Sequence, residues 1–540
     1  MKRTTCIALL LLSCHAVAAC SSASSAPDDT GSAAVDAAAD VAGPDAQADR
    51  AVADATPADA LPESAADAGP FVDPGIRMRD AGWRRGDLHN HTPVQGGGDD
   101  LGTVIALAEY FEAPEFLAAH PEYVGNHLDF LAITDHRSME AISDPAFHSD
   151  KLVMLPGEEY GDDSHACIWG LKTHIPHDPD DDGVTLEDLL SGVEQAHAQG
   201  GLFSMNHPMN AGIPFPFDVR KHDAMEVWNA SWTLMGSPYT QEALDAWEQE
   251  HGPASPFFER AIQFQGTTAA GQALRMYEAQ LCRGVHVALV GGSDRHAFLM
   301  SGFPTSWALM DEDSVAGFLA AVKARHTFVS RTPVAATVEM SVQLGDGTYM
   351  AGDDVPTAGT DGKAQVTLRV GRAEGGRVQL VLGHACATDA DVAGSSLGQP
   401  VLDEPVPSND FTTTVTVPVV AGDWFYPVVL EPLLAPGLDP ELAKGVEKTV
   451  KLAMQASEED YGKFVEVFMD HLDASTLLAP EECDPAAWDP DMLQCIPADQ
   501  KSIATYYVPD WLSRVLNAVM EEGHPSDWCM GAVASAVLFQ

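Results

Sequence analysis

Short motifs rich in histidine and acidic residues recur along the middle of the chain, each beside an apolar run typical of a buried strand. The first is Gly86-Asp87-Leu88-His89-Asn90-His91-Thr92. Residues i and i+2 of a strand face the same side, so His89 and His91 can bind one ion together. A lone His-x-His would equally describe two surface histidines. The motifs that follow favour a metal site; they are Thr134-Asp135-His136, Gly157-Glu158-Glu159, His165, Asn206-His207-Pro208 and Ser293-Asp294-Arg295-His296.

The apolar runs alternate with helical patterns. Thr185 and Asp188 form the start of a capping box, and Gly200 follows a helix expected over residues 185–199. A second helix is expected over residues 314–325. The expected strands are residues 128–134, 151–155, 165–171, 202–205, 224–227, 285–290 and 306–309. This alternation predicts an α/β fold whose parallel sheet is long enough to close as a barrel, with the site at the carboxyl ends of the strands.

The sequence before the barrel is typical of an exported lipoprotein. Residues 1–20 read as a signal peptide, and Val17-Ala18-Ala19-Cys20 resembles a bacterial lipobox, which predicts a lipid on Cys20. The alternative is an ordinary signal peptide cut after Ala19, which would give a periplasmic or secreted protein. Residues 21–75 are rich in Ala, Asp, Pro and Ser, so we expect a disordered tether that holds the folded part away from a membrane.

The barrel is expected over residues 80–333, and two further segments follow it. Residues 334–435 contain alternating runs separated by Gly- and Asp-rich turns, which predicts a small β-sandwich with an accessory role. Residues 436–540 are predicted to be a helical extension, with helices at 440–455, 458–472 and 509–522. Neither segment shows a cluster of catalytic residues.

Charge and cysteine content limit the possible partners. Lys and Arg number 29 against 80 Asp and Glu, a net charge of −51, which argues against nucleic-acid binding through a basic patch. A small anionic substrate stays compatible, because bound cations dominate the local field. Cys483 and Cys495 are the expected disulfide, and Cys167 is expected to be a free buried thiol. No Cys-x-x-Cys occurs, so a thiolate zinc site is not expected.

The order of the motifs over residues 82–333 resembles the polymerase-and-histidinol-phosphatase (PHP) superfamily of metal-dependent hydrolases, and within it the branch of the carbaryl hydrolases (CehA/McbA type). The resemblance implies a distorted (β/α)7-type barrel with two or three divalent ions, and imidazole with carboxylate suits zinc, manganese or iron. Five or six motifs in the family's order carry it.

The resemblance also implies a role for each motif residue. The first ion would be bound by His89, His91 and Asp294, with Glu159 bridging to a second ion bound by His165 and His207. A third ion would be held by His136 and His296. Glu158 is the alternative to Glu159, and Asp99 is an additional candidate ligand of the third ion.

Other polar residues near the motifs have two possible explanations each. Arg295 contacts an anionic substrate or pairs with nearby acids, and Asp135 is expected to orient His136. Glu226 and Asn229 match a family element on the rim of the site or satisfy the end of their own strand. Residues Asp178 to Gly183 resemble the start of a calcium loop but lack its closing Glu, so a solvated loop is the other interpretation.

These features predict a metal-dependent hydrolase that is anchored by a lipid to the bacterial cell envelope, at the outer membrane, and acts on a small molecule. A hydroxide bridging two ions would attack a phosphoester, with Asp294 or His207 as proton acceptor. Carbamate or carboxylic-ester hydrolysis is the alternative for the same fold, and a surface binding lipoprotein is the non-enzymatic one. No Gly-x-Ser-x-Gly elbow or Walker loop supports a serine hydrolase or a nucleoside triphosphatase. The oligomeric state is left open.

Overall fold

The computed structural model describes most of the predicted barrel and the β-rich segment after it. The described residues are 82–95, 100–109, 128–162, 164–176, 184–210, 213–229, 239–264, 269–296, 301–333, 335–432, 488–489, 494–495 and 528–540. The predicted signal peptide with Cys20, the tether, Asp99, the loop Asp178 to Gly183, Cys483 and the three predicted C-terminal helices lie outside these residues.

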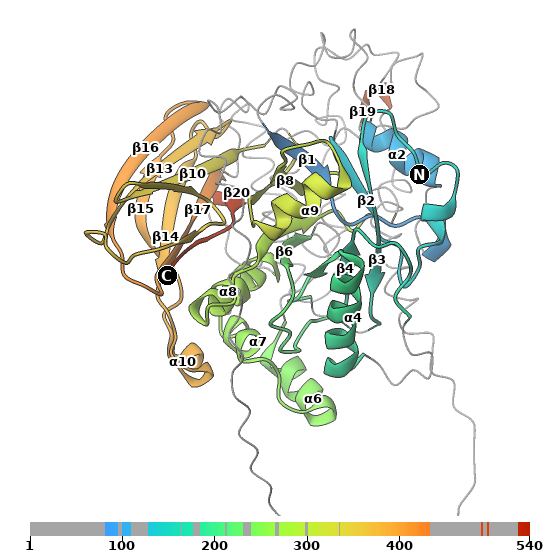
Figure 1. Ribbon diagram of the computed structural model, residues 1–540, viewed down its shortest axis with the longest axis horizontal. Helices are drawn as coiled ribbons and strands as arrows, with labels where there is room; N and C mark the ends of the chain where they lie inside the picture. The colour runs from blue at the N-terminus through green and yellow to red at the C-terminus, as the bar shows by residue number, and fades with distance from the viewer. Residues whose placement is uncertain are drawn as a thin grey trace, which may run out of the picture.

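Nine strands form a curled sheet in the first part of the chain (Figure 1). They are β1 (Trp83–Asp87), β2 (Phe130–Ile133), β3 (Val153–Tyr160), β4 (Ala166–Trp169), β5 (Leu202–Met205), β6 (Ala224–Asn229), β7 (Ala288–Gly292), β8 (Thr305–Leu309) and β9 (Thr327–Ser330). Their order is β9-β8-β1-β2-β3-β4-β5-β6-β7. The Thr327 hydroxyl donates to the Leu289 carbonyl at 2.8 Å, so β9 meets β7 and the ends of the curl come together.

The sheet is mixed, and the prediction of a parallel sheet throughout is wrong. β1, β2 and β3 pair in parallel, as do β5, β6 and β7. β4 is antiparallel to both of its neighbours, and β8 is antiparallel to β1 and β9. Only residues 161–165 join β3 to β4, whereas a parallel crossover needs a dozen or more residues. The two strands therefore form a hairpin.

Helices surround this sheet: α2 (Leu101–Glu109), α4 (Leu186–Gln199), α6 (Gln241–His251), α7 (Pro256–Ala261), α8 (Ala269–Cys282) and α9 (Val315–Lys323), with short 3-10 turns η2 (Pro93–Gln95) and η4 (Glu140–Ser143). The predicted capping box of α4 is confirmed, because Thr185 accepts from the Asp188 N–H and Asp188 accepts from the Thr185 N–H. Gly200 ends α4 at a φ of +84°, as its sequence position predicts.

The interior of the curl is filled by apolar side chains. Phe130 of β2, Leu155 of β3 and Trp169 of β4 are buried there together with Phe318 of α9. The ring of Phe318 lies 5.1 Å from that of Phe130 and 5.8 Å from that of Trp169. Because these apolar side chains fill the interior, a site for polar ligands can form only at an end of the strands.

The rest of the described chain is β-rich. Its strands are β10 (Thr337–Leu344), β11 (Gly347–Met350), β12 (Asp354–Val355), β13 (Lys363–Gly371), β14 (Arg377–Gly383), β15 (Gln399–Pro405), β16 (Asp410–Pro418), β17 (Trp424–Pro432), β20 (Trp528–Ala534) and β21 (Val537–Phe539), with one short helix, α10 (Asp389–Gly394). One sheet has the order β11-β10-β13-β16. Its buried side chains share an apolar core with those of β14, β17 and β20. We interpret this arrangement as a β-sandwich.

The described parts of residues 436–540 are strands that we did not predict, and the three helices predicted in this segment lie outside the described residues. β18 (Trp488–Asp489) pairs with β19 (Gln494–Cys495), and residues 528–540 form β20 and β21. β20 pairs with β17 on one side and with β9 on the other, so it joins the β-rich sheet to the barrel sheet. An apolar run without alternation fits such a strand with two neighbours, because both of its faces are buried.

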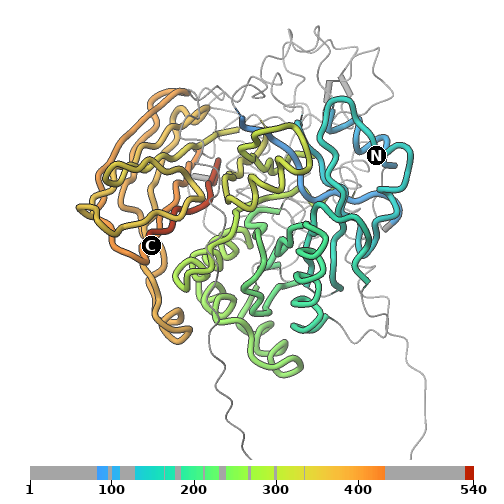
Figure 2. The backbone as a smooth tube through the Cα atoms, viewed as in Figure 1, coloured from blue at the N-terminus to red at the C-terminus, as the bar shows by residue number. Residues whose placement is uncertain are grey.

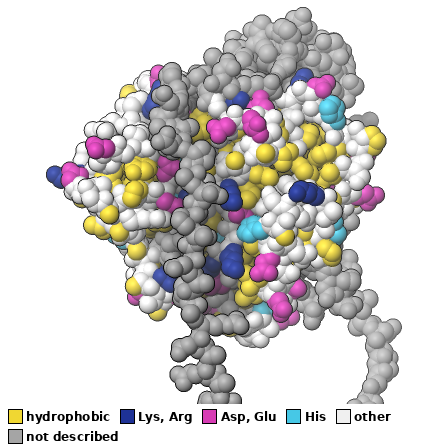
Figure 3. Space-filling view, in the orientation of Figure 1, with side chains coloured by type: hydrophobic (Ala, Val, Ile, Leu, Met, Phe, Trp, Pro, Cys, Tyr) yellow, Lys and Arg dark blue, Asp and Glu magenta, His cyan; other side chains and the backbone are white. Residues whose placement is uncertain are grey.

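The barrel and the β-rich region lie side by side and are covalently linked (Figure 2). Cys282 at the end of α8 forms a disulfide with Cys386 after β14, a pairing that we did not predict. Cys167 is free and buried, as predicted. On the face shown in Figure 3, charged side chains of both signs are scattered between apolar ones. Among the described residues, no helix combines the length and hydropathy needed to cross a bilayer.

Candidate metal centre

The predicted motif residues meet at one rim of the curled sheet. His89 and His91 follow β1, His136 follows β2, and Glu159 is next to last in β3. The other members also come from strand ends: His165 precedes β4, His207 follows β5, and Asp294 and His296 follow β7. His165 reaches the same rim from the opposite chain direction, because β4 is antiparallel to β3.

Four of these side chains form the largest group. His89, His91, Glu159 and Asp294 are all buried and each offers one ligand atom, and these atoms lie within 4.8 Å of one another. The His89 Nε2 is 3.1 Å from Glu159 Oε1 and 3.3 Å from Asp294 Oδ1. The His91 Nε2 is 3.4 Å from Glu159 Oε2 and 3.1 Å from Asp294 Oδ1.

These separations are compatible with ligands that share one ion. Ligands about 2.1 Å from one ion in a tetrahedral array are about 3.4 Å apart, close to the observed values. Among the described residues, the His89 Nε2 is buried without a well-aligned hydrogen bond, although two carboxylates lie within 3.3 Å of it. Buried polar atoms in this state carry a desolvation cost that a bound cation would offset. The residues therefore fit a divalent ion that accepts nitrogen and oxygen ligands.

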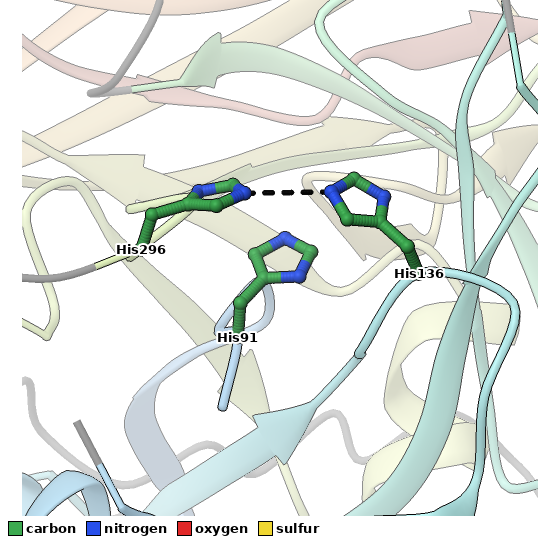
Figure 4. Close-up of side chains that lie close together, drawn as sticks. All are labelled: His91, His136 and His296. Atoms are coloured by element: carbon green, nitrogen blue, oxygen red, sulfur yellow. Dashed lines mark hydrogen bonds between the residues drawn. The ribbon is translucent and has the colours of Figure 1, made fainter. Parts of the chain in front are cut away.

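Two smaller groups adjoin the first. One contains His136, Glu159 and His165, with His136 Nδ1 at 2.8 Å and His165 Nδ1 at 3.1 Å from the Glu159 carboxylate. The other contains His91, His136 and His296 (Figure 4), where the Nε2 atoms of His136 and His296 face each other at 3.4 Å. The structure thus places His136 between the two groups, whereas the resemblance assigned it to the third ion alone.

His207 lies at the edge of the cluster. Its Nε2 is 3.4 Å from Glu159 Oε1, and its ring centroid is 5.3 Å from that of His165. Its backbone has a φ of +22°, and that of Asp294 is +50°, values uncommon outside glycine. Such strain concentrates at functional sites, where the surrounding structure maintains it.

The electrostatics of the cluster keep its carboxylates ionised. Burial alone would raise the pKa of Glu159, but His165, His89 and His136 hold it well below its ordinary value. Burial likewise opposes ionisation of Asp294, and His89 and His91 hold the pKa of that carboxyl well below its ordinary value. Both side chains are therefore acceptors at neutral pH, as metal binding requires.

The histidines of the first motif differ from each other. Burial works to lower the pKa of His89, but Asp294, Cys167 and Glu159 together raise it well above its ordinary value. Burial lowers the pKa of His91 well below its ordinary value, helped by His296 and His136. A cation would replace the proton that His89 otherwise keeps among these negative charges.

The two adjacent carboxylates of the third motif point to opposite faces of β3. Glu159 faces the cluster, whereas Glu158 accepts hydrogen bonds from the His174 Nδ1 and the Ile175 N–H. Gly157 allows the close approach of the hairpin, since a Cβ there would lie 2.4 Å from the Ile168 carbonyl oxygen. Of the two candidates, Glu159 alone contacts the other motif residues among those described.

Several side chains that hold the cluster were missed or misjudged from the sequence. Asn206 donates to Glu159 Oε1 at 2.9 Å and accepts from the Cys167 N–H at 3.0 Å. Asp87 accepts from the backbone N–H groups of His89 and Ser293, which joins the first motif to the last. Strand alternation and motif position could have pointed to Asn206, whereas nothing in the sequence pairs Asp87 with residue 293.

Asp135 and Arg295 both secure the first motif through contacts that we did not predict. The Asp135 carboxylate accepts from the Thr92 N–H at 2.6 Å and from the Thr92 hydroxyl at 2.8 Å, so it secures the first motif rather than the His136 ring. Arg295 is fully buried, and its backbone bonds to His91 N at 2.9 Å and to His89 O at 3.3 Å. A contact between its guanidinium and a substrate stays a prediction.

Comparisons with known proteins add two distant structural matches. No protein-family model and no curated protein matches the chain. A two-domain protein of Bacteroides vulgatus, described as containing a predicted PHP-like metal-dependent phosphoesterase, is 15% identical with a TM-score of 0.29, over 64% of this chain and 90% of its own. PsfC from Pseudomonas syringae is 15% identical with a TM-score of 0.28, over 45% and 89%. What the site can do is therefore judged from its own geometry.

Proposed function

We propose that this protein is a metal-dependent hydrolase of the PHP type that cleaves phosphoester bonds in a small molecule. One observation carries the proposal: six histidines and two acids from several strand ends converge on one rim, with ligand atoms spaced for shared cations. Surface or packing histidines have no reason to meet in this way.

The donor set suggests how ions would be held. His89, His91 and Asp294 would bind one ion, and Glu159 would be shared with a second ion bound by His165 with His136 or His207. His136 and His296 would bind a third. Zinc, manganese and iron all suit these ligands. When bound, such ions polarise the scissile group and lower the pKa of water from 15.7 to about 7.

The protein's own residues then position the substrate and accept the proton. Because nearby histidines hold the pKa of Asp294 well below its ordinary value, this carboxylate is a poor proton acceptor and a good ligand. If His136 and not His207 completes the second site with His165, His207 at the edge of the cluster is the better proton acceptor of the two that we predicted. An anionic phosphoester would be drawn to the bound cations in spite of the acidic chain.

We further propose that the protein is exported and anchored by a lipid on Cys20. The signal-like residues 1–20 support this, and so does the Cys282–Cys386 disulfide, since disulfides persist in oxidising compartments. Cell fractionation with radiolabelled palmitate tests it. The label should appear on the wild-type chain and be absent from Cys20→Ser, which should leave the membrane fraction. An unlabelled cytosolic wild type would contradict export.

The reaction is tested with the full chain, stripped by a chelator and reloaded with zinc, manganese or iron. Metal content is measured by elemental analysis, and turnover with an aryl phosphomonoester, a phosphodiester, an aryl carbamate and an aryl carboxylic ester. We expect at least one tightly bound ion per chain and metal-dependent phosphoester cleavage. Turnover of the carbamate or ester alone would replace the phosphoesterase assignment. Less than one ion per chain without turnover would favour a binding protein.

A further inference from the structure

Glu226 is a buried acid on β6 whose carboxylate faces the metal centre without being one of its predicted ligands. Glu226 is 3% exposed to solvent. Oε1 lies 3.2 Å from the His89 Nδ1. Oε2 accepts from the His207 backbone N–H at 3.0 Å and from the Asn229 side-chain amide at 2.9 Å. One carboxylate thus contacts two separate parts of the cluster.

The contact with His89 determines which ring nitrogen faces the cluster. A proton on Nδ1 directed at Glu226 leaves the lone pair on Nε2, the atom nearest to Glu159 and Asp294. The Asn206 amide is 3.5 Å from the same Nδ1, but it makes its shorter bond, 2.9 Å, to Glu159. A carboxylate behind a histidine in this way fixes the ring and increases its basicity.

The contact with His207 restrains a strained segment of backbone. His207 has a φ of +22°, and its N–H donates directly to Glu226 Oε2. Loss of this acceptor would leave a buried N–H without its partner and remove a restraint on that conformation. The ring of His207 would then lose its fixed position beside Glu159.

The neighbouring strand provides the space that these contacts need. A Cβ at Gly292 of β7 would lie 2.5 Å from the His89 Cβ and 2.6 Å from Glu226 Oε1. Any larger residue at this position would push His89 and Glu226 apart. Glycine at the end of β7 thus lets the ring and the carboxylate meet.

We propose that Glu226 is a positioning residue of the metal centre: one oxygen orients the His89 ring, and the other fixes the backbone at His207. This rests on the proposed function, because it assumes that the cluster binds cations. Glu226 contacts the groups behind the ligand atoms and is not itself expected to touch metal or substrate.

Glutamine cannot replace this carboxylate. Three donors meet two acceptor oxygens, and an amide offers one oxygen and one NH2 group. In Glu226→Gln, either the His89 Nδ1–H or the His207 N–H and Asn229 amide must face that NH2 group. Glu158→Gln is a matched control, because Glu158 is also buried and also accepts hydrogen bonds from a histidine Nδ1 and a backbone N–H. These donors belong to His174 and Ile175, which lie outside the cluster.

The test measures zinc affinity of the full chain by competition with a chromophoric chelator. Loss of such an outer contact typically weakens metal binding 10- to 100-fold, and we expect a decrease of about this size for Glu226→Gln. We expect Glu158→Gln to bind zinc as the wild type does. The visible absorption of the cobalt-loaded protein should change in Glu226→Gln and stay unchanged in Glu158→Gln, because only the first frees a predicted ligand ring.

The outcomes separate this proposal from the proposed function. A wild type that binds zinc tightly, with Glu226→Gln equal to it, would overturn the positioning role and leave the metal centre intact. A wild type without zinc binding would overturn both. Equal losses in Glu226→Gln and Glu158→Gln would show a general effect of removing a buried charge and also overturn the role. If Glu226→Gln does not fold, Glu226→Asp keeps the charge but is one methylene shorter, and wild-type affinity in that variant would contradict the proposal.

Discussion

The rim of the barrel and its junction with the β-rich region both bury charged groups, but they do so differently. At the junction two buried acids have arginine partners: Arg331 pairs with Glu431 at 3.0 Å, and Glu278 contacts Arg275 at 2.7 Å. At the rim, His89 has a buried ring nitrogen for which the described residues provide no well-aligned hydrogen bond. Buried polar groups with partners hold a fold together, whereas a buried polar group without one needs a bound group to complete it. The rim should therefore control metal binding and the junction stability.

The largest effect should follow from Glu159→Gln. Glu159 contacts His89, His136 and His165 through its two oxygens, so its loss removes a ligand shared by two predicted ions. We expect metal affinity and turnover to fall by more than about 100-fold, the upper range for outer contacts, because a ligand itself is lost. Elemental analysis and kinetics measure this.

Glu158→Gln again serves as the control, one residue away on the opposite face of β3, and should retain both properties. His89→Ala and His207→Ala should also abolish turnover and lower metal content while the fold, followed by circular dichroism, is kept. Full activity in Glu159→Gln would contradict the assignment of metal binding to the rim and of stability to the junction.

The pH dependence of metal binding should show which rim group keeps a proton. The pKa of His89 is raised well above its ordinary value, while those of Glu159 and Asp294 are held well below theirs. Near neutral pH, zinc must therefore displace a proton from His89 but not from the acids. Affinity should rise about tenfold per pH unit from pH 6.5 upward until the pH passes the pKa of His89. Competition titrations at several pH values measure the slope.

His89→Ala provides the comparison for this slope. It should bind zinc weakly and with a smaller pH dependence, because the displaced proton is gone. An affinity of the wild type that is constant or decreases with rising pH would contradict a protonated His89 in the metal-free protein.

The sequence predicted the rim better than it predicted the sheet. Strand ends marked by His89, Glu159 and Asp294 could be found, because polar residues that interrupt apolar runs need a reason to be buried. Glu158 and Glu159 could not be separated by periodicity, since alternation puts them on opposite faces without saying which face is inside. Periodicity also gives no strand direction. The five-residue link between β3 and β4 is too short for a parallel crossover, but its length depends on where β3 ends, which the sequence placed at residue 155.

Contacts between distant residues were outside the reach of the sequence. Nothing local pairs Glu226 with His89, 137 residues earlier, or Cys282 with Cys386, 104 residues later. β20 was missed because its place between β17 and β9 depends on the finished sheet. Local patterns thus located the chemistry, and tertiary structure decided its partners.

Glu431→Ala tests the junction side of the comparison. It leaves the fully buried Arg331 guanidinium without its carboxylate, which typically costs about 3–5 kcal/mol of stability. Denaturant unfolding of the metal-loaded protein measures this, and zinc affinity of the folded variant should be unchanged. The double variant Arg331→Met/Glu431→Leu should lose less stability, since no charge stays buried. A large loss of zinc affinity in Glu431→Ala would mean that the junction also shapes the rim.

Thr185→Ala sharpens the comparison within the barrel itself. Thr185 caps α4, which ends just before β5 and the His207 motif, so it is part of the barrel but not of the rim. Removing a capping hydroxyl costs about 1 kcal/mol, here from the reciprocal bond with Asp188. Thr240→Ala, which caps α6 without such a box, should cost less by the same unfolding measurement. Both variants should bind zinc as the wild type does, because stability distributed over the barrel helices does not reach the ligand atoms. A shift of zinc affinity in Thr185→Ala alone would show that α4 controls the position of His207, and the boundary of the metal centre would then include that helix.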